Sequence, residues 1–257
     1  MKLVEFILRH GANQDEDGKF SIEVPKELIH ENLMEITPEM ERYVNIKITC
    51  NGKKYCASEA KKIAKERKLN GFFKKYCNGF GLDIGHGGSP VIFTVKQSEW
   101  PENSDVDLWD INDGDAQYLG NVEDETYDFV HASHCLEHVQ NCYLTLINWF
   151  RVVKKGGYLI FVVPERDLYE KKKYLPSNWN EDHKTFFKLE DHDPPCTVGV
   201  LPLIHGSLYG QDYEIVYTKV YKDGDFNPDP SAHPPMASGN FSIEAVVKKL
   251  DHEDNSS

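Results

Sequence analysis

Two histidines and a glutamate fall within one short stretch and could carry acid–base chemistry. The stretch reads His134-Cys135-Leu136-Glu137-His138. A helix through it would place His134 and His138 one turn apart on the same face, and imidazole has the pKa to take a proton from a hydroxyl group. The same spacing could hold a divalent metal, for which two histidines and a carboxylate suit a borderline metal better than magnesium. The alternative for His138 is a structural side chain packed on an amphipathic helix.

A glycine-rich turn follows an apolar run in the central part of the chain. It reads Leu82-Asp83-Ile84-Gly85-His86-Gly87-Gly88-Ser89-Pro90. Glycines let the backbone turn sharply and approach a ligand with no Cβ in the way. Taken alone, the pattern is equally compatible with a tight turn that binds nothing.

An acidic stretch comes about twenty residues after this turn. Val106-Asp107-Leu108-Trp109-Asp110 predicts a second strand that ends in acid. Asp107 lies at the interval where a β-α-β unit returns a carboxylate to the ribose of a nucleoside. The alternative is a solvated loop acid, because the neighbourhood also holds Asp105, Asp110 and Asp113.

Apolar runs alternate with helical spacing through this part of the chain, and these elements would position the candidate residues. The runs Tyr127–Ser133 and Tyr158–Pro164 predict buried parallel strands. A helix is expected from Ser58 toward Tyr76, and another over Leu136–Val153, ended by Lys154-Lys155-Gly156-Gly157. The alternation predicts a doubly wound, mostly parallel sheet. Two later segments, Tyr213–Val220 and Phe241–Lys248, are also strand-like.

The first 57 residues have a different pattern and predict a small β-rich appendage. Short strands are expected at Val4–Leu8 and Phe20–Val24 around a polar connector, and Val44–Cys50 runs into the hairpin signal Asn51-Gly52. No catalytic set lies in this region, so its role is open between a lid, a dimerisation arm and a packing extension. We expect a catalytic domain over 58–250 and a frayed polar tail at 251–257.

Composition limits the classes of partner. The 257 residues are 40% hydrophobic and carry a net charge of −13, which makes a nucleic-acid partner unexpected because phosphate binding needs a positive surface. The six cysteines form no C-x-x-C pair and predict a reducing, cytoplasmic setting. The run Leu3–Leu8 is too short for a signal peptide, and no stretch approaches the length of a membrane span.

The order of these motifs resembles that of the class I S-adenosylmethionine-dependent methyltransferases. The resemblance covers about residues 78 to 190 and is closest to the small-molecule and glycan-modifying branch, in which Leu-Glu-His follows the fourth strand. Pro90 stands at the last glycine position of a dinucleotide loop, which argues against a nicotinamide or flavin enzyme. The motifs in order are Leu82-Asp83-Ile84-Gly85-x-Gly87, Asp107-Leu108, Gly114-Asp115-Ala116, Tyr127-Asp128-x-Val130, Leu136-Glu137-His138-Val139 and Arg151-Val152-Val153-Lys154-x-Gly156-Gly157.

The resemblance implies a Rossmann-like, seven-stranded sheet that binds S-adenosyl-L-methionine. Asp107 would then take the ribose hydroxyls and Leu108 would cover the adenine, while Asp115 and the backbone of Ala116 would meet the adenine edge. Ser133 and His134 would lie beside the reacting sulfonium. The amino-acid end of the cofactor would face Asp83 and the turn formed by Gly85, His86 and Gly87.

The resemblance also implies the catalytic set and the reaction. His134, His138 and His183 are the candidate bases, with His183 in the loop after the fifth strand, where it could face His134. Related methyltransferases use Glu-x-x-Glu-His for a metal; here His134 replaces the first glutamate, which leaves His134, Glu137 and His138 as a weak metal set. We expect O-methylation of a sugar, glycan or other small polar hydroxyl. The alternatives are N-methylation of a small molecule or protein, and a non-catalytic cofactor-binding scaffold.

Overall fold

The computed structural model divides the chain into two compact units, Met1–Ser58 and Glu59–Ser257. The structure describes residues 13–14, 20–21, 49–50, 53–54, 59–87, 90–95, 97–222, 226–231 and 240–251. No helix in this described part of the chain is long and apolar enough to cross a membrane.

The first unit contributes two short antiparallel strand pairs. The strands β3 (Thr49–Cys50) and β4 (Lys53–Lys54) flank Asn51-Gly52, as the hairpin signal predicts. The strand β2 (Phe20–Ser21) pairs with β1 (Asn13–Gln14), which lies in the stretch expected to be the connector. The expected strand Val4–Leu8 lies outside the described residues.

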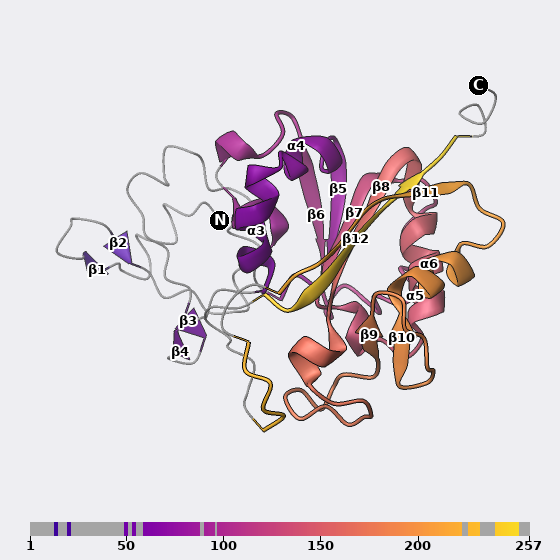
Figure 1. Cartoon of the computed structure of the whole chain (residues 1–257). Helices are drawn as coiled ribbons and strands as arrows, with labels where there is room; N and C mark the ends of the chain where they lie inside the picture. The colour runs from indigo at the N-terminus through magenta and orange to yellow at the C-terminus, as the bar shows by residue number, and fades with distance from the viewer. Residues whose placement is uncertain are drawn as a thin grey trace. The chain divides into compact units, whose positions relative to one another are not determined.

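The second unit is built on a mixed six-stranded sheet with the order β11-β12-β8-β7-β5-β6 (Figure 1). The neighbours from β6 to β8 are parallel, whereas β12 and β11 close the other edge as an antiparallel hairpin. This confirms the Rossmann-like doubly wound class. The strands are β5 (Phe80–Ile84), β6 (Asp105–Trp109), β7 (Tyr127–Ser133), β8 (Val153–Pro164), β11 (Tyr213–Val220) and β12 (Ser242–Lys249).

The sheet has six strands in the described chain, where seven were expected. The segment between β6 and β7, residues 110–126, forms turns and makes no strand. Its sequence is rich in aspartate and glycine and lacks the alternating apolar residues that a strand at this edge would bury. The loop after β6 therefore replaces the expected edge strand.

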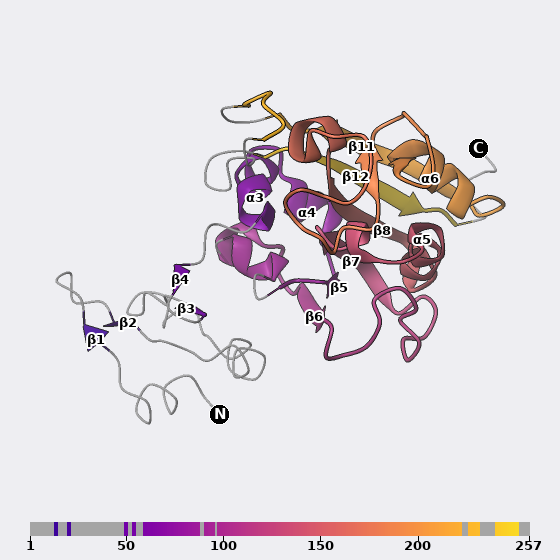
Figure 2. The same cartoon turned by 90° about the horizontal axis from the view of Figure 1, so that it is seen from below.

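Helices cover both faces of the sheet (Figures 1 and 2). On one face lie α3 (Glu59–Leu69) and α4 (Phe72–Tyr76), and on the other α5 (Cys142–Arg151) and α6 (Val200–Ser207). Side chains of β8 alternate between the two layers: Phe161 packs in the cluster that holds residues of α5 and α6, whereas Ile160 packs in the cluster that holds residues of α4. This period of two is what a strand buried on both faces requires.

The helix expected over Leu136–Val153 is shorter than predicted. Residues Leu136–His138 form a single 3₁₀ turn, and α5 begins only after Asn141, whose side chain accepts a hydrogen bond from the Leu144 N–H and caps the helix. The predicted helix end Lys154–Gly157 lies in β8 instead. His134 precedes the 3₁₀ turn with a left-handed φ of 54°, so His134 and His138 do not share a helix face.

A buried polar network, here called the Arg67 network, joins α3 to the centre of the sheet. The Arg67 Nε–H donates to Glu244 Oε1 at 2.7 Å, and Arg67 Nη1 lies 3.1 Å from His131 Nε2. His131 Nδ1 lies 2.6 Å from Asp83 Oδ1, and the Tyr221 hydroxyl donates to Glu244. All five side chains are buried, and the Arg67 guanidinium pairs directly with the Glu244 carboxylate.

Candidate active site

The candidate residues gather at one edge of the sheet, where the parallel strands end. The glycine turn follows β5, Asp110 follows β6, His134 follows β7 and Glu165 follows β8. Carboxyl ends of parallel strands meet at the same edge, which is where open α/β sheets bind their ligands.

The glycine turn is held against its neighbours by backbone contacts. The Gly85 N–H donates to the Trp109 carbonyl at 2.8 Å, and the Gly87 N–H donates to Asp110 Oδ2 at 3.1 Å. Gly85 and Gly87 have φ values of 67° and 55°, which favour glycine. A Cβ on Gly85 would lie 2.7 Å from Cys135 Sγ, so the turn and the exit of β7 are packed together. Burial raises the pKa of the Cys135 thiol to about 12, which makes it a packing group and no nucleophile.

Asp83 is buried beneath the glycine turn and is already paired. Its Oδ2 accepts a hydrogen bond from the Val91 N–H at 2.7 Å, and its Oδ1 lies 2.6 Å from His131 Nδ1. The side chain is 2% exposed. Asp83 therefore holds the turn to the Arg67 network.

Asp107 and Leu108 lie inside β6, away from the site edge. In the register of the sheet Asp107 is opposite Leu82, and Asp107 Oδ2 accepts a hydrogen bond from the Tyr127 hydroxyl at 2.9 Å. Burial, and then this hydrogen bond, raise the pKa of Tyr127. Leu108 packs beside the core cluster that holds residues of α4. The expected ribose and adenine contacts of this pair do not agree with these positions, because the strand continues to Trp109.

Asp110 and Ile111 occupy the positions that were expected for Asp107 and Leu108. Asp110 is the first residue after β6, and its Oδ2 accepts the Gly87 N–H and lies 3.7 Å from His86 Nε2. The Ile111 side chain is 87% exposed. Counting twenty residues from the glycine turn selects Asp107, which lies inside β6, whereas the end of the apolar run at Trp109 marks Asp110 as the acid at the end of the strand. His86 faces this acid.

The remaining cofactor candidates lie around the same edge. Asp115 is exposed and its Oδ1 accepts the Gln117 N–H at 2.8 Å, while the Ala116 carbonyl accepts the Trp149 indole N–H at 2.9 Å. The Ser133 hydroxyl is buried at the end of β7 and has no hydrogen-bond partner among the described residues. An orphaned hydroxyl at this edge fits a site that a ligand completes.

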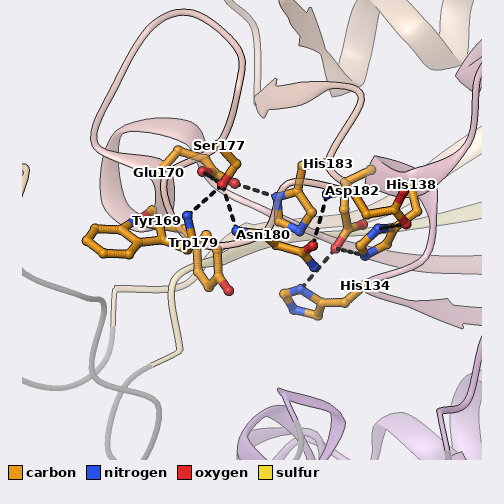
Figure 3. A network of polar contacts seen from close by, with 10 residues as sticks. His134, His138, Tyr169, Glu170, Ser177, Trp179, Asn180, Asp182 and His183 are labelled. Carbon is orange, nitrogen blue, oxygen red and sulfur yellow. Dashed lines mark hydrogen bonds and ion pairs between the residues drawn. The ribbon is translucent and has the colours of Figure 1, made fainter.

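Glu137 is the centre of a second group of ionisable residues, here called the Glu137 cluster. Its side chain is 1% exposed, His134 Nδ1 lies 3.3 Å from its Oε1, and His138 Nε2 lies 3.9 Å from the same oxygen. His183 completes the cluster, and its ring centroid is 4.8 Å from that of His138. Figure 3 shows the three histidines close together, two from the stretch after β7 and one from the loop after β8. The structure thus brings together all three predicted histidines.

Opposing effects act on the Glu137 carboxyl. Burial pushes its pKa upward, but His134 and then the charges of His138 and His183 outweigh burial and hold the pKa below its usual value. Glu137 is therefore the anionic centre of the cluster.

Each histidine of the cluster has one ring nitrogen in contact with a polar side chain other than Glu137. His183 Nδ1 lies 2.5 Å from Glu170 Oε1, and His138 Nδ1 lies 3.1 Å from Asp182 Oδ2. Figure 3 shows the pairs His183–Glu170 and His138–Asp182. His134 Nε2 lies 3.1 Å from Ser242 Oγ. Carboxylates behind Nδ1 favour the tautomer that carries the proton there and leave Nε2 of His138 and His183 as the acceptor.

The loop that carries His183 is itself well anchored. Glu170 ends the π-helical segment η7 (Arg166–Glu170), and the Ser177 hydroxyl donates to its second oxygen. The Lys184 N–H donates to the Glu137 carbonyl at 2.7 Å, which ties the loop to the 3₁₀ turn. Glu170 and Asp182 were not predicted from the sequence. No rule of sequence spacing relates Glu170 to His183, or Asp182 to His138.

Comparison with known proteins gives the family. A model described as a methyltransferase domain matches residues 44–192, more than half of the chain, and the chain belongs to this family. It is a Rossmann-like, S-adenosylmethionine-dependent methyltransferase, and S-adenosyl-L-methionine is its methyl donor. No curated protein matches the sequence significantly.

The chain is also similar to several solved structures of methyltransferases. One from Thermotoga maritima, described as a possible histamine N-methyltransferase, is 20% identical, with 74% of this chain and 91% of that chain covered and a TM-score of 0.44. A putative methyltransferase from Bacillus halodurans is 14% identical, with 73% and 100% covered and a TM-score of 0.46. One from Archaeoglobus fulgidus is 16% identical, with 74% and 94% covered and a TM-score of 0.45.

Proposed function

We propose that this methyltransferase acts on an oxygen of a small polar acceptor, with a sugar or glycan hydroxyl as the leading class. The observation that carries the proposal is the Glu137 cluster at the carboxyl end of β7. When bound, S-adenosyl-L-methionine supplies a methyl group activated by a positively charged sulfur. A neutral hydroxyl acceptor must also lose its proton, and a set of histidines is suited to that task.

The residues around the glycine turn fit the cofactor, and we assign them from their positions. The backbone of Gly85, His86 and Gly87 would hold its amino-acid end, and the Ser133 hydroxyl would bind close to its reactive end. Asp110 replaces Asp107 as the acceptor for the ribose hydroxyls, because it lies at the end of β6 beside Gly87. The exposed Ile111 replaces Leu108 as the cover of the adenine. Asp115 and the Ala116 backbone remain the candidates for the adenine edge.

The side chains of the Glu137 cluster are arranged to take the proton from an acceptor hydroxyl. Glu170 orients His183 so that its Nε2 is free of the Glu170 contact, and Asp182 does the same for His138. Both rings lie beside the anionic Glu137 carboxylate, at the carboxyl end of β7. His134 has Glu137 on one side and Ser242 on the other, so its part is to position the carboxylate.

The setting of the reaction is also part of the proposal. The described cysteines Cys77, Cys135, Cys142 and Cys196 are all free thiols, which supports a reducing, cytoplasmic compartment. The net charge of −13 supports a small-molecule or glycan acceptor over a nucleic acid.

The test is to identify the methylated atom. The purified chain is incubated with S-adenosylmethionine carrying an isotopically labelled methyl group and with matched pairs of acceptors, a sugar and the corresponding amino sugar with its hydroxyls blocked. Label in a methyl ether is the expected result. Label only on nitrogen would contradict O-methylation, and cofactor binding without transfer to either type of acceptor would indicate a non-catalytic domain.

A further inference from the structure

Glu137 is a buried carboxylate with no donor of its own. Neither carboxylate oxygen has a hydrogen-bond partner in the described part of the chain, although the side chain is 1% exposed. The nearest groups that can carry positive charge are histidine rings, which are charged only when protonated. The carboxylate therefore has no permanent positive charge beside it and depends on protonated histidines, which a positive ligand could replace.

Three ligand atoms already surround one point in this cluster. One atom each from Glu137, His138 and His183 lie within 4.8 Å of one another. In a tetrahedral zinc site with bonds near 2.1 Å the ligand atoms lie roughly 3.4 Å apart. Small side-chain rotations would therefore bring the three atoms to bonding distance of a single ion.

The two histidines are oriented as metal ligands commonly are. A histidine ligand usually has a carboxylate or carbonyl behind its second nitrogen, which fixes the tautomer and makes the ligand nitrogen more basic. Glu170 occupies that place behind His183 at 2.5 Å, and Asp182 occupies it behind His138 at 3.1 Å. In each ring Nε2 is then the nitrogen left to bind.

We propose that Glu137, His138 and His183 form a binding site for a divalent transition-metal ion, Zn²⁺ first and Mn²⁺ second, in preference to Mg²⁺. The two imidazoles suit Zn²⁺, and the carboxylate is the donor that also suits Mn²⁺. The set differs from the sequence-based one because His183 takes the place of His134, whose two ring nitrogens face Glu137 and Ser242. Three protein ligands leave open positions on the ion, as in catalytic sites.

The site has a consequence for the reaction, and only this consequence rests on the proposed function. An acceptor hydroxyl bound at an open position would have its pKa lowered by the cation and would be held in a fixed orientation. His138 and His183 would then act as ligands, and the acidity of the hydroxyl would come from the ion.

The first experiment measures metal binding without any reaction. The full chain is stripped with a chelator, dialysed and titrated with Zn²⁺ and Mn²⁺ by calorimetry, with Mg²⁺ for comparison. Co²⁺ serves as a visible-absorption probe of imidazole ligation. We expect one ion per chain for Zn²⁺ or Mn²⁺ with Mg²⁺ at least tenfold weaker.

Variants assign the ion to the cluster. Glu137→Gln and His183→Asn should each lose high-affinity binding, and Glu170→Gln should weaken it by about 10–100-fold, as expected for a group behind a ligand. The exposed His205, which contacts Tyr213 outside the cluster, gives the matched control His205→Asn with unchanged binding. A thermal unfolding transition at the wild-type temperature shows that each variant is folded. Unchanged stoichiometric binding in folded Glu137→Gln, or no stoichiometric binding to the wild type, would overturn the proposal.

Activity separates this proposal from the proposed function. Loss of methyl transfer after chelation, restored by Zn²⁺ or Mn²⁺, supports both. Metal binding at Glu137 with no methylation of any hydroxyl acceptor supports the site and contradicts the function, whereas full activity of chain that binds no metal overturns the site and leaves the function standing.

Discussion

Two buried groups of acids and histidines lie in the methyltransferase unit, and they are completed in different ways. The Arg67 network contains its own cation, since a guanidinium stays charged in proteins, and it joins the carboxylates of Glu244 and Asp83 through His131. The Glu137 cluster has the same kinds of acid and imidazole but only histidines as its source of charge.

The difference separates stabilisation of the fold from readiness for a ligand. In the Arg67 network the acids receive hydrogen bonds from neighbouring elements, so α3, β12, β7 and β5 are joined by a closed set. In the Glu137 cluster the carboxylate oxygens are without donors among the described residues. A group of the first kind should matter to stability, and a group of the second kind should matter to binding and rate.

The largest effect is expected from removing the cation of the first group. Arg67→Met leaves Glu244 as an uncompensated buried charge and should lower the free energy of unfolding by about 3–5 kcal/mol. Urea denaturation measures it. The control is Lys68→Met, one residue along α3, whose ion pair with Glu99 is about a third exposed and should contribute less than about 1 kcal/mol. Equal losses in the two variants would mean that the buried network is no more stabilising than a surface pair.

The reverse pattern is expected at Glu137. Glu137→Gln should reduce turnover by about 100-fold or more, the size typical of losing one acid–base group, because the anionic centre is gone. The free energy of unfolding of metal-free protein should change by less than about 1 kcal/mol, because no hydrogen bond to the carboxylate is lost. A loss of stability as large as that of Arg67→Met would mean that the Glu137 cluster stabilises the fold as much as the Arg67 network does, which would contradict this distinction.

A matched pair of acids tests the cofactor site. Asp110→Asn removes the charge at the end of β6 and should weaken binding of S-adenosylmethionine by about tenfold or more, the range for a hydrogen bond to a charged group. Asp107→Asn should bind normally, since an amide oxygen can still accept from the Tyr127 hydroxyl. Calorimetry with the cofactor measures both. Weaker cofactor binding in Asp107→Asn than in Asp110→Asn would instead assign the ribose contact to Asp107.

The sequence predicted well those features that depend on local pattern. Apolar runs predicted the four parallel strands of the six-stranded sheet, because a strand buried on both faces must be apolar on both faces. The helix start at Asn141 was missed, although asparagine is a good cap, because the apolar spacing runs on through Leu136 and Val139. The six-stranded sheet was missed because the seventh strand came from the family resemblance and the loop after β6 has no strand pattern.

The site was predictable only in part, for a physical reason. Residues next to a strand end, such as Ser133 and His134, are placed by the strand itself. Partners that meet through folding of a long loop have no spacing rule, so Glu170 behind His183 and Asp182 behind His138 appear only in three dimensions. His131 was overlooked for the same reason, since only the sheet register places it beside Asp83.

The smallest effect is expected on stability at acidic pH, and it distinguishes an ionised Glu137 from a neutral one. The histidines hold the pKa of Glu137 below its usual value in the fold, so the ionised form stabilises the protein above that usual pKa. This contribution is lost as the pH falls through the lowered pKa, because the folded carboxyl must then take up a proton. Metal-free wild type should therefore lose more stability than Glu137→Gln between about pH 5 and pH 3, measured as the shift of the unfolding temperature. Parallel curves for the two proteins would mean that Glu137 is not ionised in the folded protein. A neutral Glu137 would not require a positive partner, whereas Glu244 in the Arg67 network has one in Arg67.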